Sequence, residues 1–347
     1  MAKRNFGDEF GFQTRAVHTG NDVDSETGAI KRPITMANSY ELPYDPSDLN
    51  WSSAGKNLYT RNGGSNQQYL QEKLASLEGG EDCVVLASGV AALSGLFFAL
   101  LKSGDHVVFS SVTYIAVYRL LNELLKDKFG VETTIVDTTD IEKVKAAIRP
   151  NTKLIHIETP GNPTLSISDI EKIAELAHAS GALLSVDNTF ASPFNQRPIE
   201  LGADFTVESL TKYINGHGDA MGGAIIGKKE YLDIIRAQSQ INLGATISPF
   251  NAWLIMRGSV TLPLRMKQHN ENALKVARYL KTVKGVSFVA YPGLEDHPNH
   301  DVAVKQMKNG FGGVLSFGLK ADHDTYNRFV THLKVITSAV SLGHDES

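Results

Sequence analysis

Cysteine is almost absent from this chain. Its 347 residues include only Cys83, so no internal disulfide can form. Cys83 lies in the apolar run 83–87, and the simplest interpretation is a thiol packed in a buried strand. His217 and Asp219 could supply half of a metal site, but no second ligand pair with suitable spacing accompanies them. We therefore predict no metal site.

The sequence also lacks an excess of charge of one sign and lacks long apolar runs. Its 34 basic and 38 acidic residues give a net charge of −4, which does not indicate binding to nucleic acid or to an anionic membrane. The longest apolar run, 90–101, is too short to span a bilayer. The first ten residues contain no apolar segment of a secretion signal. We expect a cytoplasmic protein.

Short apolar runs alternate with segments of helical length from residue 83 onward. Because these runs show no clear polar alternation, they predict a mostly parallel sheet covered on both faces by helices, an α/β fold. In such sheets ligands bind at the carboxyl ends of the strands. The expected strands are 83–87, 106–110, 132–136, 153–157, 182–186, 205–208 and 224–226, and the expected helices are 90–101, 114–126, 141–148, 170–179 and 231–238.

The pattern divides the chain into three parts. Residues 1–57 contain no convincing sheet unit and are predicted to form an extended N-terminal arm with turns, including one at 51–55. Residues 58–248 hold the alternating pattern and are predicted to form the cofactor domain. Residues 249–347, beginning at Pro249, are predicted to form a smaller C-terminal α+β domain, with helices at 252–265 and 272–284 and strands at 286–290 and 314–318.

Lys212 carries the most specific chemical signal. It follows the predicted strand 205–208 and stands beside Ser209 and Thr211, whose hydroxyl groups could bind an anion. Burial lowers the pKa of a lysine amine, and the neutral amine condenses with carbonyl groups. Asp187 ends another predicted strand and could hold a protonated pyridine nitrogen. A reactive lysine with such an acid predicts pyridoxal 5′-phosphate (PLP) as the cofactor.

Two strand ends add candidates for the same cofactor. Ser88, Gly89 and Val90 follow a strand and open a helix, where backbone amides could bind a phosphate. An ordinary helix cap explains these three residues equally well, and the three-glycine spacing of a dinucleotide site is missing. Tyr114 follows the strand 106–110 and could stack on a planar ring, although a core aromatic is the simpler interpretation.

Two loops provide further candidates. Tyr59 and Arg61 could together clamp a phosphate, although a loop arginine is usually only solvated. Asn162 lies between Pro160 and Pro163, which would fix the loop and present the asparagine rigidly. A turn without a ligand is the alternative there.

Taken together, these motifs resemble the Cys/Met-metabolism family of PLP-dependent enzymes of fold type I. That family includes cystathionine γ-synthase, cystathionine γ-lyase, methionine γ-lyase and O-acylhomoserine sulfhydrylase. The resemblance runs from about Thr14 to the last residue and implies a sheet sandwiched by helices, with an arm and a smaller C-terminal domain. The matching segments, besides the lysine motif, are Ala16–Gly20, Tyr59–Arg61, Ala87–Gly89, Glu158–Pro163, Val186–Phe190, Met256–Gly258 and Ala339–Gly343.

The resemblance implies a role for each candidate residue. Lys212 would bind the cofactor aldehyde and later move protons at the substrate α-carbon and at cofactor C4′. Asp187 would pair with the ring nitrogen. Tyr114 would stack on the ring, contact the substrate and exchange a proton with the γ-leaving group. The remaining implied roles are phosphate binding by Ser88, Gly89, Val90, Ser209 and Thr211, a contact to cofactor O3′ by Asn162, substrate carboxylate binding by Ser341, and phosphate binding in a neighbouring subunit by Tyr59 and Arg61.

The shared site implies a homo-oligomer, with a dimer as the smallest active unit and a tetramer as the expected assembly. The implied reaction is γ-elimination from cystathionine, homocysteine or methionine, giving a 2-oxo acid, ammonia and a thiol. The alternative within enzymes is γ-replacement, which joins an O-acylhomoserine to cysteine or sulfide. A PLP-binding protein without turnover is a third possibility. The missing glycine fingerprint disfavours a nicotinamide oxidoreductase.

The chain also departs from the family pattern. Methionine γ-lyases commonly have a cysteine two residues after the stacking tyrosine, where this chain has Ala116, and a lysine where it has Gln240. The usual Gly-Asn-Pro-Thr after the arginine is replaced by Asn62–Asn66. We therefore do not expect methionine to be the preferred substrate. The family has a further C-terminal segment with a carboxylate-binding arginine, so we expect a sequence ending at Ser347 to be cut short or to bind amino acids poorly.

Overall fold

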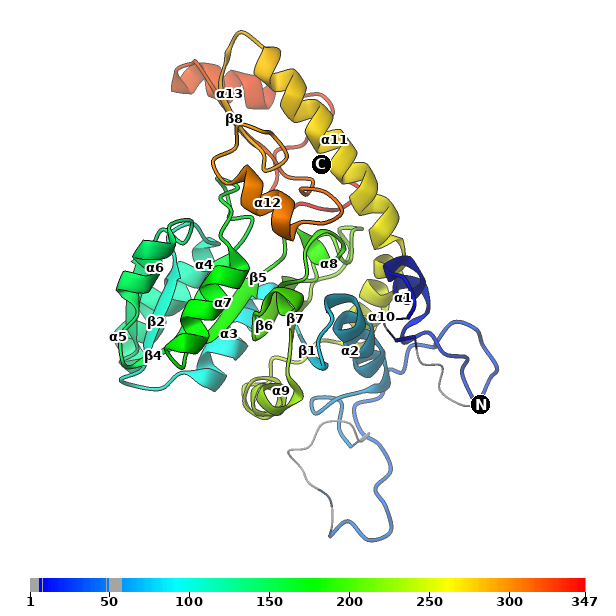
Figure 1. Ribbon diagram of the computed structural model, residues 1–347. Helices are drawn as coiled ribbons and strands as arrows, with labels where there is room; N and C mark the ends of the chain where they lie inside the picture. Colours follow the sequence, from blue (N-terminus) through cyan, green and yellow to red (C-terminus); the bar gives the residue numbers. More distant parts are fainter. Residues whose placement is uncertain (1–5, 8, 48, 50–57, 347) are drawn as a thin grey trace.

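A seven-stranded sheet forms the centre of the computed structural model, which describes residues 6–7, 9–47, 49 and 58–346 (Figure 1). The strand order is β1-β7-β6-β5-β4-β2-β3. Only β7 runs antiparallel to its neighbours β1 and β6, so the other strands are parallel, as predicted. The strands are β1 (Asp82–Leu86), β2 (His106–Ser110), β3 (Glu132–Val136), β4 (Thr152–Glu158), β5 (Leu183–Asp187), β6 (Phe205–Ser209) and β7 (Gly223–Gly227).

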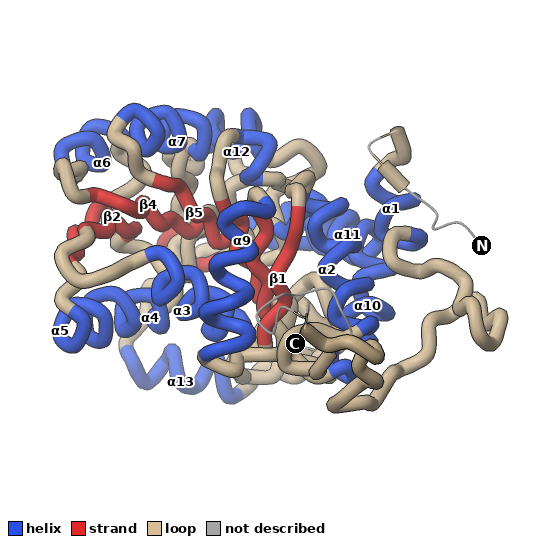
Figure 2. The backbone as a smooth tube through the Cα atoms, turned by 90° about the horizontal axis from the view of Figure 1, so that it is seen from below, coloured by secondary structure: helices blue, strands red, loops and turns tan. Residues whose placement is uncertain are grey.

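Helices cover both faces of this sheet. Val107 and Phe109 of β2 pack into an apolar cluster with α3 and η1, whereas Val108 packs into a cluster with α6 and α7. Figure 2 shows α6 and α7 on one side of the strands and α3, α4 and α5 on the other. Successive strand residues point to opposite faces, so a sheet buried on both sides needs uninterrupted apolar strands. The bounds are α3 (Gly89–Leu100), α4 (Ile115–Tyr118), η1 (Arg119–Leu125), α5 (Lys126–Phe129), α6 (Ile141–Ala147), α7 (Ile170–Ala179), α8 (Ser192–Asn195), η2 (Pro198–Leu201), α9 (Lys229–Ile235) and η3 (Arg236–Asn242).

The predicted helices after Pro249 are wrong in their bounds. The structure has α10 (Pro249–Gly258), a short 3-10 turn η4 (Ser259–Thr261) and one long helix α11 (Leu262–Thr282). The break therefore falls at η4 and not between residues 265 and 272. Pro263 explains the difference, because a proline in the first turn of a helix needs no hydrogen-bond donor and marks a start.

The remaining elements lie at the two ends of the chain. Helix α11 runs from the neighbourhood of α1 toward β8 and α13 (Figure 1). The arm contains α1, which the sequence did not predict, and the predicted turn at 51–55 lies outside the described residues. The domain boundaries at 57 and 248 stay predictions. The other bounds are α1 (Phe12–His18), α2 (Ser65–Glu78), β8 (Val286–Ala290), α12 (His300–Gln306), β9 (Ser316–Leu319) and α13 (His323–Thr331), with β8 and β9 forming a separate antiparallel pair.

The sheet positions three acidic or hydroxyl side chains along one edge. Strand β4 ends at Glu158, β5 at Asp187 and β6 at Ser209. Glu158 pairs in register with Asp187, and Asp187 pairs with Val207. Because these strands are parallel, their carboxyl ends meet at the same edge, where a ligand site is expected. No helix in the described part of the chain has both the length and the apolar character to cross a bilayer.

Candidate active site

A cavity of about 650 Å³ opens at this edge of the sheet. It collects residues from the carboxyl ends of five strands, β1, β2, β4, β5 and β6, and from the segment near residue 341, which is distant in the sequence. The residues predicted for the cofactor or substrate that line it are Ser88, Gly89, Val90, Tyr114, Asn162, Asp187, Ser209, Thr211, Lys212 and Ser341. The structure therefore brings together all but two of the predicted site residues.

Lys212 presents its amine to this cavity. The side chain is half-buried, and its Nζ donates a hydrogen bond to Ser341 Oγ at 2.8 Å. Burial lowers the pKa of the Lys212 ammonium group from its ordinary value. The side chain of the neighbouring Thr211 is oriented by two hydrogen bonds: its Oγ1 donates to the Gly222 carbonyl and accepts from the Gly222 amide. A lysine in this state reaches its neutral, nucleophilic form more readily than a solvated one.

Asp187 is a buried carboxyl group with 7% of its surface exposed. Its Oδ1 accepts a hydrogen bond from the Thr189 amide at 3.1 Å, and Thr189 Oγ1 accepts one from the Ser209 amide at 2.9 Å. Burial raises the pKa of Asp187, while the bonds from Thr189 lower it in part. A buried carboxylate that lines a cavity and has so few donors can hold a cationic or N–H group of a ligand.

The amino end of α3 forms a cradle beside these two residues. Ser88 caps the helix, its Oγ accepting a hydrogen bond from the Ala91 amide at 3.1 Å. The amides of the first helical turn, including those of Gly89 and Val90, have no acceptor within the helix. A Cβ at Gly89 would stand 2.8 Å from the Ser209 Cβ, so only glycine allows this close approach. Such a helix end beside a serine hydroxyl can bind a phosphate group.

One carboxyl group, that of Glu158, joins two strand-end loops. Its Oε2 accepts hydrogen bonds from the Tyr114 amide at 2.6 Å and from Thr113 Oγ1 at 3.2 Å, and its Oε1 accepts one from the Asn162 amide at 2.9 Å. Burial and, secondly, the charge of Asp187 raise the pKa of Glu158 to about 8. Glu158 therefore fixes the backbone of both predicted cofactor contacts, and Tyr114 as a whole residue stays 44% exposed.

Tyr59 and Arg61 are not among the residues that line the cavity. Both side chains are exposed, and the Arg61 guanidinium lies 5.4 Å from the centre of the Tyr59 ring. Within one chain the two residues therefore form a small cation–π unit apart from the other predicted residues.

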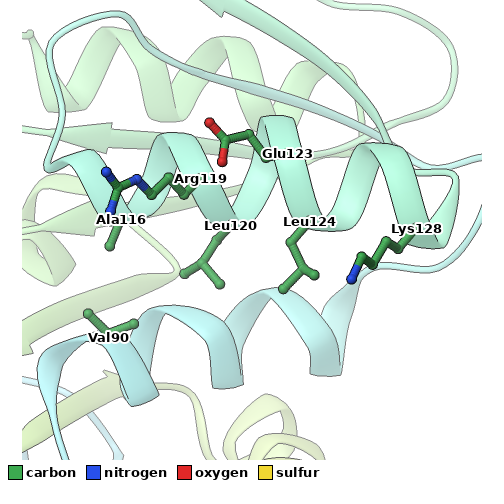
Figure 3. Close-up of a pocket in the computed structure, with 7 residues that line it drawn as sticks. All are labelled: Val90, Ala116, Arg119, Leu120, Glu123, Leu124 and Lys128. Carbon is green, nitrogen blue, oxygen red and sulfur yellow. The ribbon is translucent and has the colours of Figure 1, made fainter.

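A second hollow of about 390 Å³ lies between α3 and the helical stretch from α4 to α5. Figure 3 shows Val90 on one helix facing Leu120 and Leu124 on the other. Of the residues that line it, only Val90 was predicted to contact the cofactor. Within the described residues, no group of three or more His, Cys, Asp or Glu side chains is arranged to hold a metal ion.

Several residues that line the main cavity were not predicted from the sequence as individual contacts. Glu158 was identified only as part of the motif around Asn162, and Thr189 only as part of the motif around Asp187. Glu158 ends the buried strand β4, and Thr189 follows the buried strand β5 by two residues. This position at a strand end was the sequence signal that could have identified them. Phe190 and Met221 also line the cavity, but a lone apolar residue in a loop gives no sign of its neighbours.

The residues of the main cavity fit pyridoxal phosphate. The group needs an amine for its aldehyde, an acid for its ring nitrogen and donors for its phosphate. Lys212 has a pKa lowered by burial, Asp187 is a buried carboxyl group that lines the cavity, and the α3 terminus offers amides beside Ser209. These three features come from three different elements and meet at one cavity. A chance arrangement of the same residues would not bring them together.

Comparisons with known proteins agree with this fit. The profile of the family described as Cys/Met metabolism PLP-dependent enzyme matches residues 13–347. A canavanine gamma-lyase from Rhizobium leguminosarum bv. trifolii is 56% identical over 346 residues, 99% of this chain and 86% of that protein. An L-methionine gamma-lyase from Fusobacterium nucleatum subsp. polymorphum is 40% identical over 98% of this chain and 86% of its own length.

A solved structure is similar along nearly the whole chain. Cystathionine gamma synthase from Xanthomonas oryzae pv. oryzae, in complex with aminoacrylate and cysteine, superposes with a TM-score of 0.91 at 37% identity. The match covers 97% of this chain and 85% of that one. The predicted fold class, the PLP cofactor and an enzyme of the γ-elimination and γ-replacement type are thereby confirmed. The chain belongs to the Cys/Met metabolism family of PLP-dependent enzymes.

Proposed function

We propose that this enzyme is a γ-lyase whose preferred substrate is canavanine, an amino acid with a guanidino-oxy group on its γ-carbon. The observation that carries the choice is the 56% identity to a canavanine gamma-lyase, against 40% to a methionine gamma-lyase. Two departures from the methionine γ-lyase pattern support it, because Ala116 and Gln240 stand where cysteine and lysine are common there.

The proposed roles follow from the positions of the side chains. When bound, pyridoxal phosphate supplies an electron sink for the charge left on the substrate α-carbon after its proton is removed. Lys212, the amine with the lowered pKa, takes that proton. Asp187 accepts a hydrogen bond from the ring nitrogen and keeps it protonated. Tyr114, whose backbone amide donates to Glu158, would hold the cofactor ring by stacking and would donate a proton to the departing γ-substituent.

The other residues of the cavity bind and orient. Ser209, Thr211, Ser88 and the amides of Gly89 and Val90 bind the phosphate. Asn162, which lines the cavity, would contact the cofactor O3′. Ser341, whose hydroxyl group meets the Lys212 amine, binds the substrate carboxylate.

We propose that the active unit is a homodimer within a tetramer, located in the cytoplasm. Tyr59 and Arg61 are exposed and stand outside the cavity of their own chain, which suits a role at the phosphate of a partner subunit. An arginine offers the fixed fork of donors that phosphate recognition uses. A single chain would then have an incomplete site.

Sulfur amino acids form the second candidate substrate class, supported by the similarity to a methionine gamma-lyase. γ-Replacement is the alternative reaction, because the similar cystathionine gamma synthase structure shares the fold over 97% of this chain. All these reactions remove a substituent from the γ-carbon. They differ in the leaving group and in whether water or a thiol completes the reaction. The shape of the cavity near Tyr114 and Ile115 would set the choice of leaving group.

A steady-state comparison on the holoenzyme tests the proposal. The assay measures release of the γ-substituent under one set of conditions. The substrates compared are canavanine, cystathionine, methionine, homocysteine, and O-acetylhomoserine with cysteine. For canavanine, elimination with one water gives 2-oxobutyrate, ammonia and hydroxyguanidine. We expect its kcat/KM to exceed that for each sulfur amino acid by at least about tenfold. A higher kcat/KM for a sulfur amino acid, or cystathionine as the main product, would contradict the proposed substrate.

A further inference from the structure

Two glutamates behind the active site lie together in the protein interior. Glu78 is the last residue of α2 and is 0% exposed, and Glu208 lies in β6 and is 1% exposed. Their carboxyl groups are within hydrogen-bonding reach of one another. Glu208 stands immediately before Ser209 and four residues before Lys212, so the backbone joins it to two residues that line the cavity.

Asn188 connects this pair to Asp187. Its side-chain nitrogen lies 3.0 Å from Glu208 Oε1, 3.3 Å from Glu78 Oε1 and 2.9 Å from the Gln196 backbone carbonyl, so its two N–H groups are shared among three acceptors. Gln196 in turn donates from Nε2 to Asn188 Oδ1 at 3.0 Å. The backbone amide of Asn188 donates to the Val207 carbonyl at 3.0 Å, one residue from Glu208. The residue next to Asp187 is therefore held from both its backbone and its side chain.

If both glutamates were ionised, one of their carboxylate oxygens would be buried without a hydrogen-bond donor. Glu78 Oε2 is buried and has no hydrogen-bond donor within the described residues. Arg197, a cation that acts on Glu78, is already paired with Glu200 at 2.6 Å. Two buried carboxylates in contact repel one another and lose their hydration. A single proton between them removes the repulsion and supplies the missing donor.

We propose that Glu78 and Glu208 share one proton as a hydrogen-bonded acid and carboxylate pair, which positions Asp187 through Asn188. The pair carries one negative charge and leaves both oxygens that face Asn188 as acceptors. A second set of hydrogen bonds also holds Asp187: the Thr189 amide donates to Asp187 Oδ1, and the Ser209 amide donates to Thr189 Oγ1. Both members are positioning residues, because neither lines the cavity. The proposal does not depend on which substrate the enzyme uses.

The electrostatics agree with a shared proton. Burial raises the pKa of Glu78 to about 7, and burial with the charge of Glu78 raises the pKa of Glu208 well above its usual range. A folded state that holds a proton more tightly than the unfolded chain loses stability as the pH rises. This loss begins above the unfolded value near pH 4.5 and continues through the folded values. The titratable and charged groups around the pair are Cys83 on β1, Asp187 on β5, Arg197 and Glu200 at η2.

Three variants separate this proposal from a purely steric role. In E208Q the amide keeps an acceptor for Asn188 and donates permanently to Glu78, so the pair keeps its geometry and its single negative charge. E78Q is the mirror-image variant. E208L leaves Glu78 buried with no proton-sharing partner and removes one acceptor from Asn188. A role in packing alone would treat Gln and Leu alike, because both have about the volume of glutamate.

Infrared spectroscopy of the holoenzyme at pH 7 gives the direct readout. The wild type should show the carbonyl band of a protonated carboxylic acid that is lost in both E208Q and E78Q. E158Q serves as the reference, because it identifies any acid band that belongs to Glu158, whose pKa is also raised. Difference spectra in which E208Q and E78Q lose only carboxylate bands would overturn the proposal.

Thermal unfolding between pH 5 and pH 9 gives the second readout. We expect the Tm of the wild type to fall relative to that of E208Q as the pH rises, because only the wild type must release the shared proton. E208L should unfold about 5–10 °C below E208Q at pH 7. The pH at which bound cofactor changes its absorbance should match the wild type in E208Q and shift in E208L. Equal behaviour of E208Q and E208L in both measurements would contradict the positioning role.

Discussion

Lys212 Nζ and Ser341 Oγ lie 2.8 Å apart, although 129 positions separate the two residues in the chain. Ser341 reaches this position with a φ of 102°, a region that residues other than glycine rarely adopt. The backbone near residue 341 is therefore held in a strained conformation while its hydroxyl group meets the reactive amine. Strain of this kind is found where the surrounding structure forces a functional geometry.

This strain makes two substitutions of Ser341 distinguishable. Both S341A and S341G remove the hydroxyl group and should raise KM for the amino acid substrate, since Ser341 is proposed to bind its carboxylate. S341G also relieves the backbone, so it should be more stable than S341A by about 1 kcal/mol. Denaturant unfolding and steady-state kinetics check the two parts separately. Equal stability of both variants would show that the conformation at residue 341 is not strained.

Gly89 offers a test of the phosphate cradle. In G89A the new methyl group would stand 2.8 Å from the Ser209 Cβ and crowd the space above the α3 terminus. We expect the Kd for pyridoxal phosphate to rise by at least about tenfold, as measured by the absorbance of bound cofactor. G285A is the matched control, because a Cβ at Gly285 meets no atom within 4 Å. Unchanged cofactor affinity in G89A would show that the phosphate does not bind at this end of α3.

Glu158 offers a test of how Tyr114 is positioned. In E158Q an amide NH₂ group must face either the Tyr114 amide or the Asn162 amide, donor against donor. We expect kcat to fall by roughly tenfold or more, since misplacing Tyr114 impairs proton transfer to the leaving group. E123Q is the control, because Glu123 is exposed on η1 and lines the other hollow. If E158Q turned over like E123Q, Glu158 would not position the tyrosine.

The shared-site proposal predicts complementation between two inactive variants. R61A should lose phosphate binding in the partner, and K212A should lose turnover while the fold survives. In a hybrid dimer the intact Lys212 receives the intact Arg61 from the other subunit. Mixing the two variants under conditions of subunit exchange should restore about a quarter of wild-type activity, since half of the dimers carry one intact site. A mixture that stays inactive, with exchange demonstrated, would argue that each chain holds a complete site.

Much of the fold was predictable because its signals are local. The bounds of β2, β3 and β8 agree with the predicted strands residue for residue, and each end of the other strands lies within two positions of its prediction. Apolar strands separated by helices leave few arrangements for a chain of this length. The break at η4 was missed, although Pro263 was present in the sequence as a signal for a new helix start.

The site was predictable in part for the same reason. Asp187 and Lys212 stand at strand ends, and the edge of a parallel sheet brings such positions together. The pairing of Glu78 with Glu208 could not be foreseen, because it depends on how the end of α2 packs against the sheet. Tertiary contacts of this kind leave no periodic trace in the sequence. Ser341 was identified from the family resemblance alone, since no local pattern places it beside Lys212.

A covalent bond between Lys212 and the cofactor aldehyde is the central requirement of the proposed chemistry. Borohydride reduction of the holoenzyme, with peptide mass spectrometry of the product, fixes any such bond and locates it. We predict one pyridoxyl phosphate group on the peptide that contains Lys212 and none on that peptide from K212A. A modified peptide that excludes Lys212, or no modification of a holoenzyme saturated with cofactor, would contradict this chemistry.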